Sequence, residues 1–349
     1  MFKKFVTTLG CSAALLFAAD FQVGAYYPNW LQYSQFTPED VRYDFLTDIH
    51  YGYFVPSEDG SSIANADEND NANFDALVSL AKQKKVNLQV VVGGSGNEEA
   101  MKAVAMSEEA RSAFAEAIKS FVDGNGVSSI EIDWMPAEEE EFAAHGALVS
   151  AVADAGVNVS VSVIGSVDAA KSYSSEALGK AANVMVMLTD QMSAEESTVK
   201  PNSDFVFAQE VLKAYADAGV SSAKLVPVVP LYGKTFLNAK GLGSSHEGTG
   251  SGNEGYLTYK ELMTVFDAPD YQVTFDEATQ SEVAVSSSET IVFNGIPSMK
   301  SLATFVKDND FGGIALYDIA GDHKEPIVSL LVTVGQVLRP AIKYNAKKK

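Results

Sequence analysis

Two carboxylates alternate with apolar residues in the segment 128–136, which reads SSIEIDWMP. Because a strand sends every second side chain to the same face, Glu131, Asp133 and Met135 are expected to share one face. Two neighbouring carboxylates on an inward face are costly unless a ligand, a proton or a reaction needs them. The third member of the row is a methionine, which cannot transfer a proton. The functional interpretation therefore depends on Met135.

Eight short apolar, β-branched or aromatic runs alternate with amphipathic stretches along the chain. Strands are expected at residues 21–27, 48–54, 87–92, 129–134, 158–164, 183–189, 225–231 and 313–318. Helices are expected at residues 73–85, 107–123, 138–155, 168–182, 204–218 and 298–308. Near-continuous apolar strands between helices predict a parallel sheet covered by helices, and eight such units favour a closed (β/α)8 TIM barrel. A doubly wound open sheet is the alternative, although no GxGxxG turn opens any of the helices.

The alternation is interrupted between the seventh and eighth strands. A Gly-rich loop at 241–255 is followed by a short helix at 258–266 and by three short strand patterns. This segment predicts a small α+β insertion on a βα loop, at the end of the barrel where active sites are built. The expected organisation is a signal peptide at 1–19, a barrel at 20–235 and 298–349, and the insertion at 236–297.

Composition and charge narrow the classes of partner. The chain has 349 residues, 46% of them hydrophobic, which suffices for a full core. The net charge of −21 argues against nucleic acid and anionic membranes, whereas a neutral partner such as an uncharged sugar carries no such penalty. Simple solubility explains the charge equally well. The four histidines show no metal-ligand spacing and no phosphate loop is present, so we expect neither a metal nor a cofactor.

The first 19 residues are typical of a secretory signal. Lys3 and Lys4 precede a mostly apolar run at 5–19 that ends in small residues. The single cysteine, Cys11, lies inside this run, and a lipoprotein box there is the weaker alternative because the apolar run continues past it. No later run approaches the roughly 18 apolar residues of a membrane span. We expect a secreted monomer without disulfides and without a membrane partner once the signal is removed.

Five segments, taken in order, resemble the family 18 glycoside hydrolases, the chitinases and their chitinase-like lectins. They are residues 23–30 (first strand), 90–95 (the Gly-Gly motif of the third strand), 130–136 (fourth strand), 230–236 (the Pro-x-Tyr-Gly segment of the seventh strand) and 312–318 (eighth strand). The family also places an α+β domain between strands seven and eight. The resemblance covers nearly the whole chain after the signal and implies the same barrel with the same insertion.

The resemblance assigns roles to the fourth strand. In the family this strand ends Asp-x-x-Asp-x-Asp-x-Glu: the Glu protonates the glycosidic oxygen, and the neighbouring Asp orients the N-acetyl group that attacks the anomeric carbon. Here Met135 stands at the acid position, Asp133 at the orienting Asp and Glu131 at the Asp before it. Loss of a general acid typically costs about 10²–10⁴-fold in rate. Glu131 lies roughly 6.5 Å deeper along the strand, which places it badly as a substitute.

The sixth strand departs from the family in the same direction. Where the family has Met-x-Tyr-Asp, residues 187–190 read MLTD, so Thr189 replaces the Tyr that steadies the intermediate and Asp190 is kept. Groups specific to the transition state are missing while groups that bind the substrate remain, as expected for binding without turnover.

The resemblance also implies a sugar-binding cleft. Tyr317 stands where the family has a Trp beneath the central sugar, and its ring can still stack on a pyranose. For each aromatic residue a plain core position is the alternative. The expected substrate-binding residues are Tyr26, Tyr53, Asp133, Trp134, Asp190, Tyr232 and Tyr317.

The leading hypothesis is a secreted, catalytically inactive chitinase-like protein that binds chitin or chito-oligosaccharides. One alternative is a family 18 hydrolase with altered or weak activity on N-acetylglucosamine polymers, using Glu131 or an acid from another loop. Another is a protein-interaction or inhibitor module on an inactive barrel.

Overall fold

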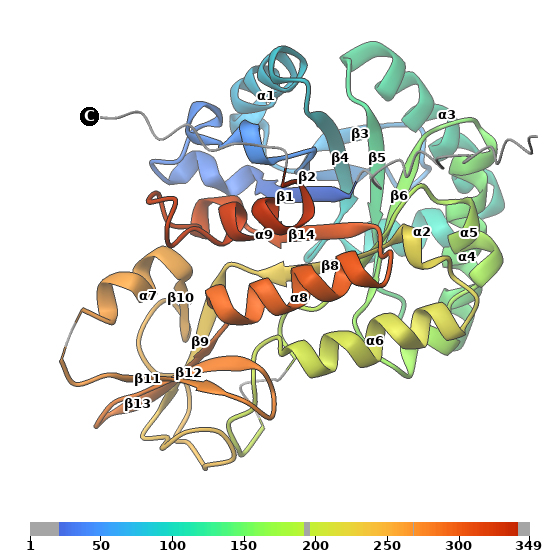
Figure 1. Ribbon diagram of the computed structural model, residues 1–349. Helices are drawn as coiled ribbons and strands as arrows, with labels where there is room; N and C mark the ends of the chain where they lie inside the picture. The colour runs from blue at the N-terminus through green and yellow to red at the C-terminus, as the bar shows by residue number, and fades with distance from the viewer. Residues whose placement is uncertain (1–20, 192–195, 268, 341–349) are drawn as a thin grey trace, which may run out of the picture.

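Eight parallel strands close into a barrel at the centre of the molecule (Figure 1). The computed structural model describes residues 21–191, 196–267 and 269–340, so the predicted signal peptide lies outside the described residues. The barrel strands are β1 (Gln22–Pro28), β2 (Asp48–Pro56), β4 (Asn87–Gly93), β5 (Ser129–Asp133), β6 (Val159–Ile164), β7 (Val184–Met187), β8 (Leu225–Pro230) and β14 (Gly313–Tyr317). Their spatial order is β1-β14-β8-β7-β6-β5-β4-β2, and β1 pairs with β2 to close the ring. The predicted TIM barrel is confirmed, and the open sheet is excluded.

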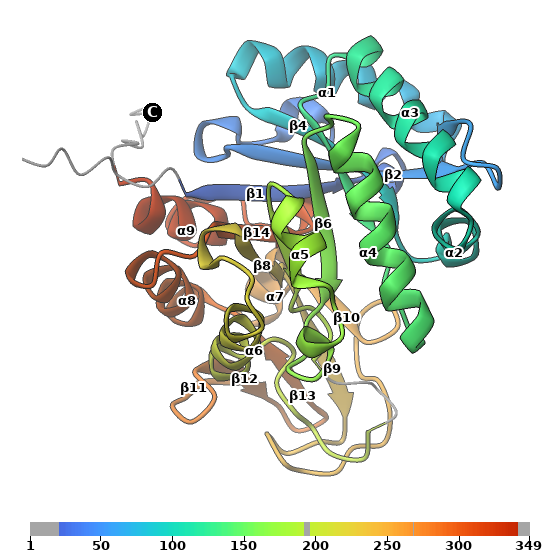
Figure 2. The same cartoon turned by 90° about the vertical axis from the view of Figure 1, so that its right-hand side faces the viewer.

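Helices surround the barrel on its outer side (Figure 2). They are α1 (Asn71–Lys84), α2 (Glu98–Met106), α3 (Glu108–Asn125), α4 (Glu139–Asp154), α5 (Ser175–Lys180), α6 (Phe205–Asp217), α8 (Ile296–Asp308) and α9 (Leu330–Leu338). Apolar residues that recur every three or four positions face the strands. In α8, for example, Met299, Leu302 and Val306 are buried on this face. Ser107 and Asp204 cap α3 and α6 through their side chains. The main apolar core therefore lies between the strands and the helices.

Short elements complete the barrel loops. β3 (Ile63–Asn65) pairs antiparallel with the end of β2. The 3-10 helices are η1 (Asn29–Tyr33), η2 (Pro38–Asp40), η3 (Tyr43–Phe45), η4 (Glu68–Asp70), η5 (Ala169–Lys171), η6 (Ser222–Lys224) and η7 (Ile319–Gly321). The helix expected over 168–182 is divided into η5 and α5, because Ser174 adopts an extended conformation and caps a new helix start.

A second sheet of five antiparallel strands stands beside the barrel, at the lower left of Figure 1. Its order is β10-β9-β13-β12-β11, built from β9 (Tyr232–Leu237), β10 (Tyr256–Thr258), β11 (Gln272–Asp276), β12 (Ser281–Val285) and β13 (Glu289–Phe293). The helix α7 (Tyr259–Val265) follows β10. Because β9 begins two residues after β8 ends, the insertion extends directly from the C-terminal end of a barrel strand.

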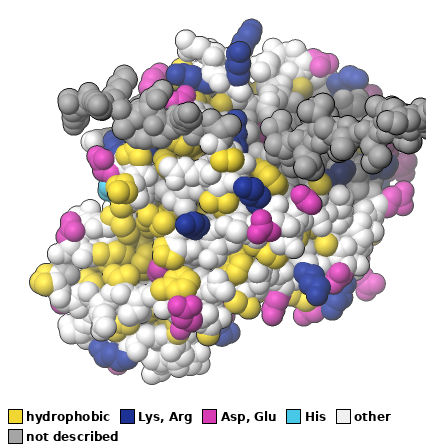
Figure 3. Space-filling view, viewed as in Figure 1, with side chains coloured by type: hydrophobic (Ala, Val, Ile, Leu, Met, Phe, Trp, Pro, Cys, Tyr) yellow, Lys and Arg dark blue, Asp and Glu magenta, His cyan; other side chains and the backbone are white. Residues whose placement is uncertain are grey.

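The face of the molecule drawn in Figure 3 carries charge of both signs and a group of apolar side chains. In Figure 3 acidic and basic side chains are scattered, and apolar side chains gather on the left of the view, where the insertion adjoins the barrel. In the part of the chain that the structure describes, no helix is both long and apolar enough to cross a membrane. Among the same residues, no group of three or more His, Cys, Asp or Glu could hold a metal ion.

Candidate functional site

A cavity of about 730 Å³ opens at the C-terminal ends of the barrel strands. The residues that line it come from the ends of β2, β4, β5, β6, β7 and β14 and the loops after them, and from β9, α2 and α6. They are Tyr53, Gly94, Ser95, Glu98, Asp133, Trp134, Met135, Ile164, Gly165, Ser166, Met187, Thr189, Asp190, Gln191, Phe207, Tyr232 and Tyr317. Most of the residues singled out in the sequence thus meet here, whereas Tyr26 and Glu131 do not line the cavity.

Glu131 lies in the barrel interior below the cavity and is fully buried. One carboxylate oxygen accepts hydrogen bonds from Tyr26 Oη at 2.5 Å and from Ser162 Oγ at 2.7 Å. The other faces His50 Nδ1 at 2.5 Å. A buried carboxylate is stable only with such partners. Since both oxygens are already bound and neither reaches the cavity, Glu131 is badly placed to deliver a proton to a ligand.

Asp133 ends β5 and lines the cavity with a relative exposure of only 8%. Burial, followed by the nearby charge of Glu131, raises its pKa to about 7. Below that pH Asp133 is a neutral carboxylic acid, which can donate a hydrogen bond to a carbonyl or hydroxyl oxygen.

Met135 is two residues beyond Asp133, lines the same cavity and is partly exposed. The nearest acids along the chain do not compensate for it. Glu141, in the first turn of α4, accepts the backbone N–H of Ala137 at 2.8 Å and forms an ion pair with Lys102 at 2.6 Å. None of the glutamates 138–141 is among the residues that line the cavity.

Aromatic rings form one wall of the cavity. The hydroxyls of Tyr53 and Tyr317 lie 3.0 Å apart, and Trp30 stacks on Tyr53 with 5.7 Å between ring centroids. Trp30 is 43% exposed, so the aromatic surface continues out of the cavity. Tyr26, predicted to bind substrate, is instead 1% exposed and lies beneath this wall, 5.3 Å from the Tyr317 ring.

Trp134 lines the cavity but is almost completely buried. Its side chain is 3% exposed, and its ring centroid lies 6.1 Å from that of His145 on α4. Most of this indole therefore packs between the barrel and the helix layer. This is the core position that the sequence left open as the alternative to substrate binding.

Asp190 connects the cavity to the insertion. Its carboxylate accepts the Tyr232 hydroxyl at 2.9 Å and forms an ion pair with Lys234 Nζ at 2.8 Å. The Tyr256 hydroxyl donates to the same carboxylate at 3.4 Å. The adjacent Thr189 lines the cavity with a side chain too short to replace a tyrosine hydroxyl.

The structure adds lining residues that the sequence did not reveal. Glu98 lies at the start of α2, with one carboxylate oxygen 2.9 Å from the N–H of Gly96. Its position four residues after Gly94, which lies in the loop that follows β4, is a signal that could have pointed to it. Phe207 on α6 and Gln191 reach the cavity only through the tertiary packing.

Comparison with known proteins gives a consistent result. The family model for "Glycosyl hydrolases family 18" matches residues 22–322. "Probable chitinase 10" from Drosophila melanogaster is 24% identical over 92% of this chain, which spans only 16% of that longer protein.

Two crystal structures share the fold. The Group IV chitinase of Ostrinia furnacalis aligns with a TM-score of 0.86 at 20% identity, over 91% of this chain and 100% of that chain. A class V chitinase mutant from Nicotiana tobaccum, in complex with NAG4, aligns with a TM-score of 0.83 at 18% identity, over 91% of this chain and 99% of that chain. With the family model spanning most of its length, the chain belongs to glycosyl hydrolase family 18, and the resemblance seen in the sequence is confirmed.

Proposed function

We propose that this protein is a secreted chitinase-like lectin that binds chitin or chito-oligosaccharides in the barrel cavity without hydrolysing them. The observation that carries the proposal is the position of Met135. It lines the cavity two residues beyond Asp133, where the family carries its general acid, and a thioether has no proton to donate.

The cavity retains groups suited to holding a sugar. The partly exposed ring of Tyr317 offers an apolar face for a pyranose, and Asp133 can hydrogen-bond an N-acetyl group or a hydroxyl. The tobacco structure with bound NAG4 supports a chito-oligosaccharide as the ligand class. With Thr189 in place of the family's tyrosine, the intermediate lacks a stabilising hydroxyl. Groups that bind the sugar remain and groups specific to the transition state are lost, so the protein binds without turnover.

Retention on chitin beads tests the binding, with cellulose beads as the matched control. Chito-oligosaccharides should also raise the melting temperature in a thermal unfolding assay. Absence of both retention and thermal protection would contradict the proposal.

A second candidate, a hydrolase with altered chemistry, is favoured by one observation. Glu98, at the start of α2, lines the cavity and is exposed. If Glu98 acted as the acid, the protein would cleave a fluorogenic chito-oligosaccharide and Glu98→Gln would abolish that cleavage. If Glu131→Gln abolished the cleavage instead, the acid would be Glu131 in the barrel interior.

Secretion rests on the N-terminal residues. Lys3 and Lys4 followed by an apolar run make a cleavable signal. N-terminal sequencing of protein recovered from the culture medium should find a chain beginning near residue 20. Recovery of uncleaved protein from the cell interior alone would contradict this part of the proposal. Size-exclusion chromatography should find a monomer.

A further inference from the structure

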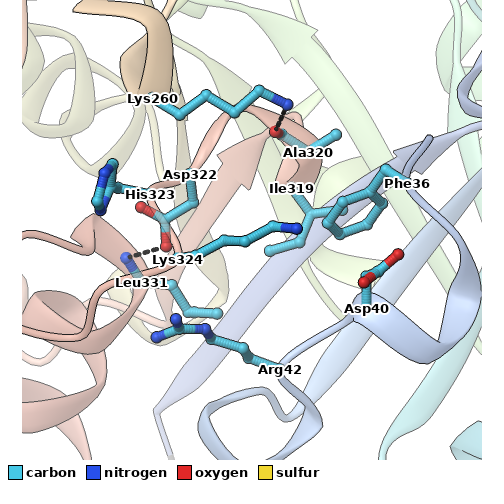
Figure 4. Close-up of a pocket in the computed structure, with 10 residues that line it drawn as sticks. All are labelled: Phe36, Asp40, Arg42, Lys260, Ile319, Ala320, Asp322, His323, Lys324 and Leu331. Atoms are coloured by element: carbon cyan, nitrogen blue, oxygen red, sulfur yellow. Dashed lines mark hydrogen bonds between the residues drawn. The ribbon is translucent and has the colours of Figure 1, made fainter. Parts of the chain in front are cut away.

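A second, smaller cavity lies away from the β5 strand end. Its volume is about 210 Å³, and it is bounded by the loops after β1 and β14, by α7 and by the start of α9 (Figure 4). Arg42, Lys260 and Lys324 line it together with Asp40 and Asp322. Three cationic side chains in one cavity are notable in a chain with a net charge of −21.

The first acid of this cavity, Asp322, is held by α9. It accepts hydrogen bonds from Ser329 Oγ at 2.5 Å, from Leu330 N at 2.8 Å and from Leu331 N at 3.4 Å. Its carboxylate therefore serves the exposed N–H groups of a helix start and has little capacity left for the cations.

The second acid, Asp40, is held by its own turn. One oxygen accepts both the N–H and the hydroxyl of Thr37, at 2.9 and 3.1 Å. The backbone hydrogen bond from Thr37, with a smaller contribution from the charge of Lys324, lowers the pKa of Asp40. No ion pair joins Asp40 to Lys324 in the described part of the chain.

The cations, in contrast, have unused donors. Arg42 Nη1 is buried and has no hydrogen-bond partner among the described residues. Lys260 Nζ donates to the backbone oxygen of Ala320 at 2.8 Å, as Figure 4 shows, which leaves two of its three N–H groups. A buried guanidinium donor without an acceptor is costly, so an acceptor-rich ligand would stabilise this arrangement.

We propose that this cavity binds the phosphate or sulfate group of a small molecule. A tetrahedral oxyanion supplies several acceptor oxygens and negative charge, which match the guanidinium of Arg42 and the ammonium groups of Lys260 and Lys324. Lys260 belongs to α7 and Arg42 to the loop after β1, so residues of both the insertion and the barrel would contact the ligand.

Thermal unfolding of the full-length protein at pH 7 tests the proposal. Sodium phosphate or sodium sulfate should raise the melting temperature by about 2–4 °C, saturably, above sodium chloride at equal ionic strength. Lys324→Gln, at an exposed position, and Arg42→Gln should lose this increment. Lys307→Gln on α8, away from the cavity, is the matched control and should keep it.

A sugar ester distinguishes the source of the anion. N-acetylglucosamine 6-sulfate that binds at least tenfold more tightly than inorganic sulfate would identify an esterified sugar as the ligand, and equal or weaker binding would identify the free anion. Sulfate stabilises many proteins by exclusion from their surface. The proposal is therefore tested by the difference in the melting-temperature rise between wild type and the cavity variants. An equal rise in wild type, Lys324→Gln and Arg42→Gln, or no rise beyond that in chloride, would overturn the proposal.

Discussion

Glu131 and Met135, at the two ends of the row that begins on β5 and continues past its last residue, lie in opposite environments. At the inner end, Glu131 is fully buried and bonded to Tyr26, Ser162 and His50. At the outer end, Met135 lines an open cavity and offers no polar group. The difference separates two uses of one strand: the inner end contributes to the barrel interior, whereas chemistry at the cavity depends on the outer end. Asp133 lies between them, and the charge of Glu131 contributes to its raised pKa.

The largest expected effect comes from returning an acid to the outer end. Met135→Glu should raise cleavage of a fluorogenic chito-oligosaccharide by about 10²–10⁴-fold, because protonation of the leaving oxygen becomes available. Adding Thr189→Tyr should increase the rate further.

Met135→Gln is the matched control, since it has the size and polarity of Glu without the acidic proton. If Met135→Glu were no faster than Met135→Gln, position 135 would not be the site of the missing chemistry.

The inner end should instead govern stability. Glu131→Ala leaves the Tyr26, Ser162 and His50 groups without their acceptor, so the free energy of unfolding should fall by about 3–5 kcal/mol. Urea unfolding measures this loss. Glu98→Ala, at an exposed carboxylate of the cavity, should change it by no more than about 0.5 kcal/mol. Similar losses for the two variants would contradict a structural role for Glu131.

Substitutions in the aromatic wall test sugar binding at the outer end of the row. Tyr317→Ala should weaken chito-oligosaccharide binding about 10–100-fold, since a sugar face loses its stacking surface. Tyr53→Phe keeps the ring and loses only the hydroxyl contact with Tyr317, so it should weaken binding less than tenfold. Affinities from intrinsic tryptophan fluorescence would show both changes. Unchanged affinity in Tyr317→Ala would place the sugar elsewhere.

Asp133 should give the smallest effect, visible in the pH dependence. Its folded pKa of about 7 lies above its unfolded value, so the folded state holds the extra proton and stability falls as pH rises from about 4 to 7. Asp133→Asn cannot ionise and avoids this loss. Its melting temperature should exceed that of wild type by about 2–5 °C at pH 8, with a smaller difference at pH 5. A difference independent of pH would contradict the raised pKa.

Much of the fold could be predicted because it depends on short-range patterns. The apolar runs that became β2, β4 and β8 begin at the predicted residues. α9 was not predicted: it reads LLVTVGQVL, in which Thr333 and Gln336 are the only polar side chains, so the pattern hardly differs from that of a buried strand.

The candidate site was only partly predictable, for a similar reason. Parallel strands bring their C-terminal ends to one edge, so Asp133, Asp190 and Tyr317 could be expected together. The depth of Tyr26 could not be foreseen, because period-two alternation gives the face of a strand and not the height at which a hydroxyl meets Glu131. The smaller cavity combines residues from three distant segments and leaves no local pattern.

Titration calorimetry with a chitin pentasaccharide tests the central claim most directly, because one trace reports both binding and turnover. Binding without hydrolysis predicts a saturable heat with a flat baseline that remains flat after saturation. No saturable heat, or a sustained heat of hydrolysis that continues after each injection, would contradict it.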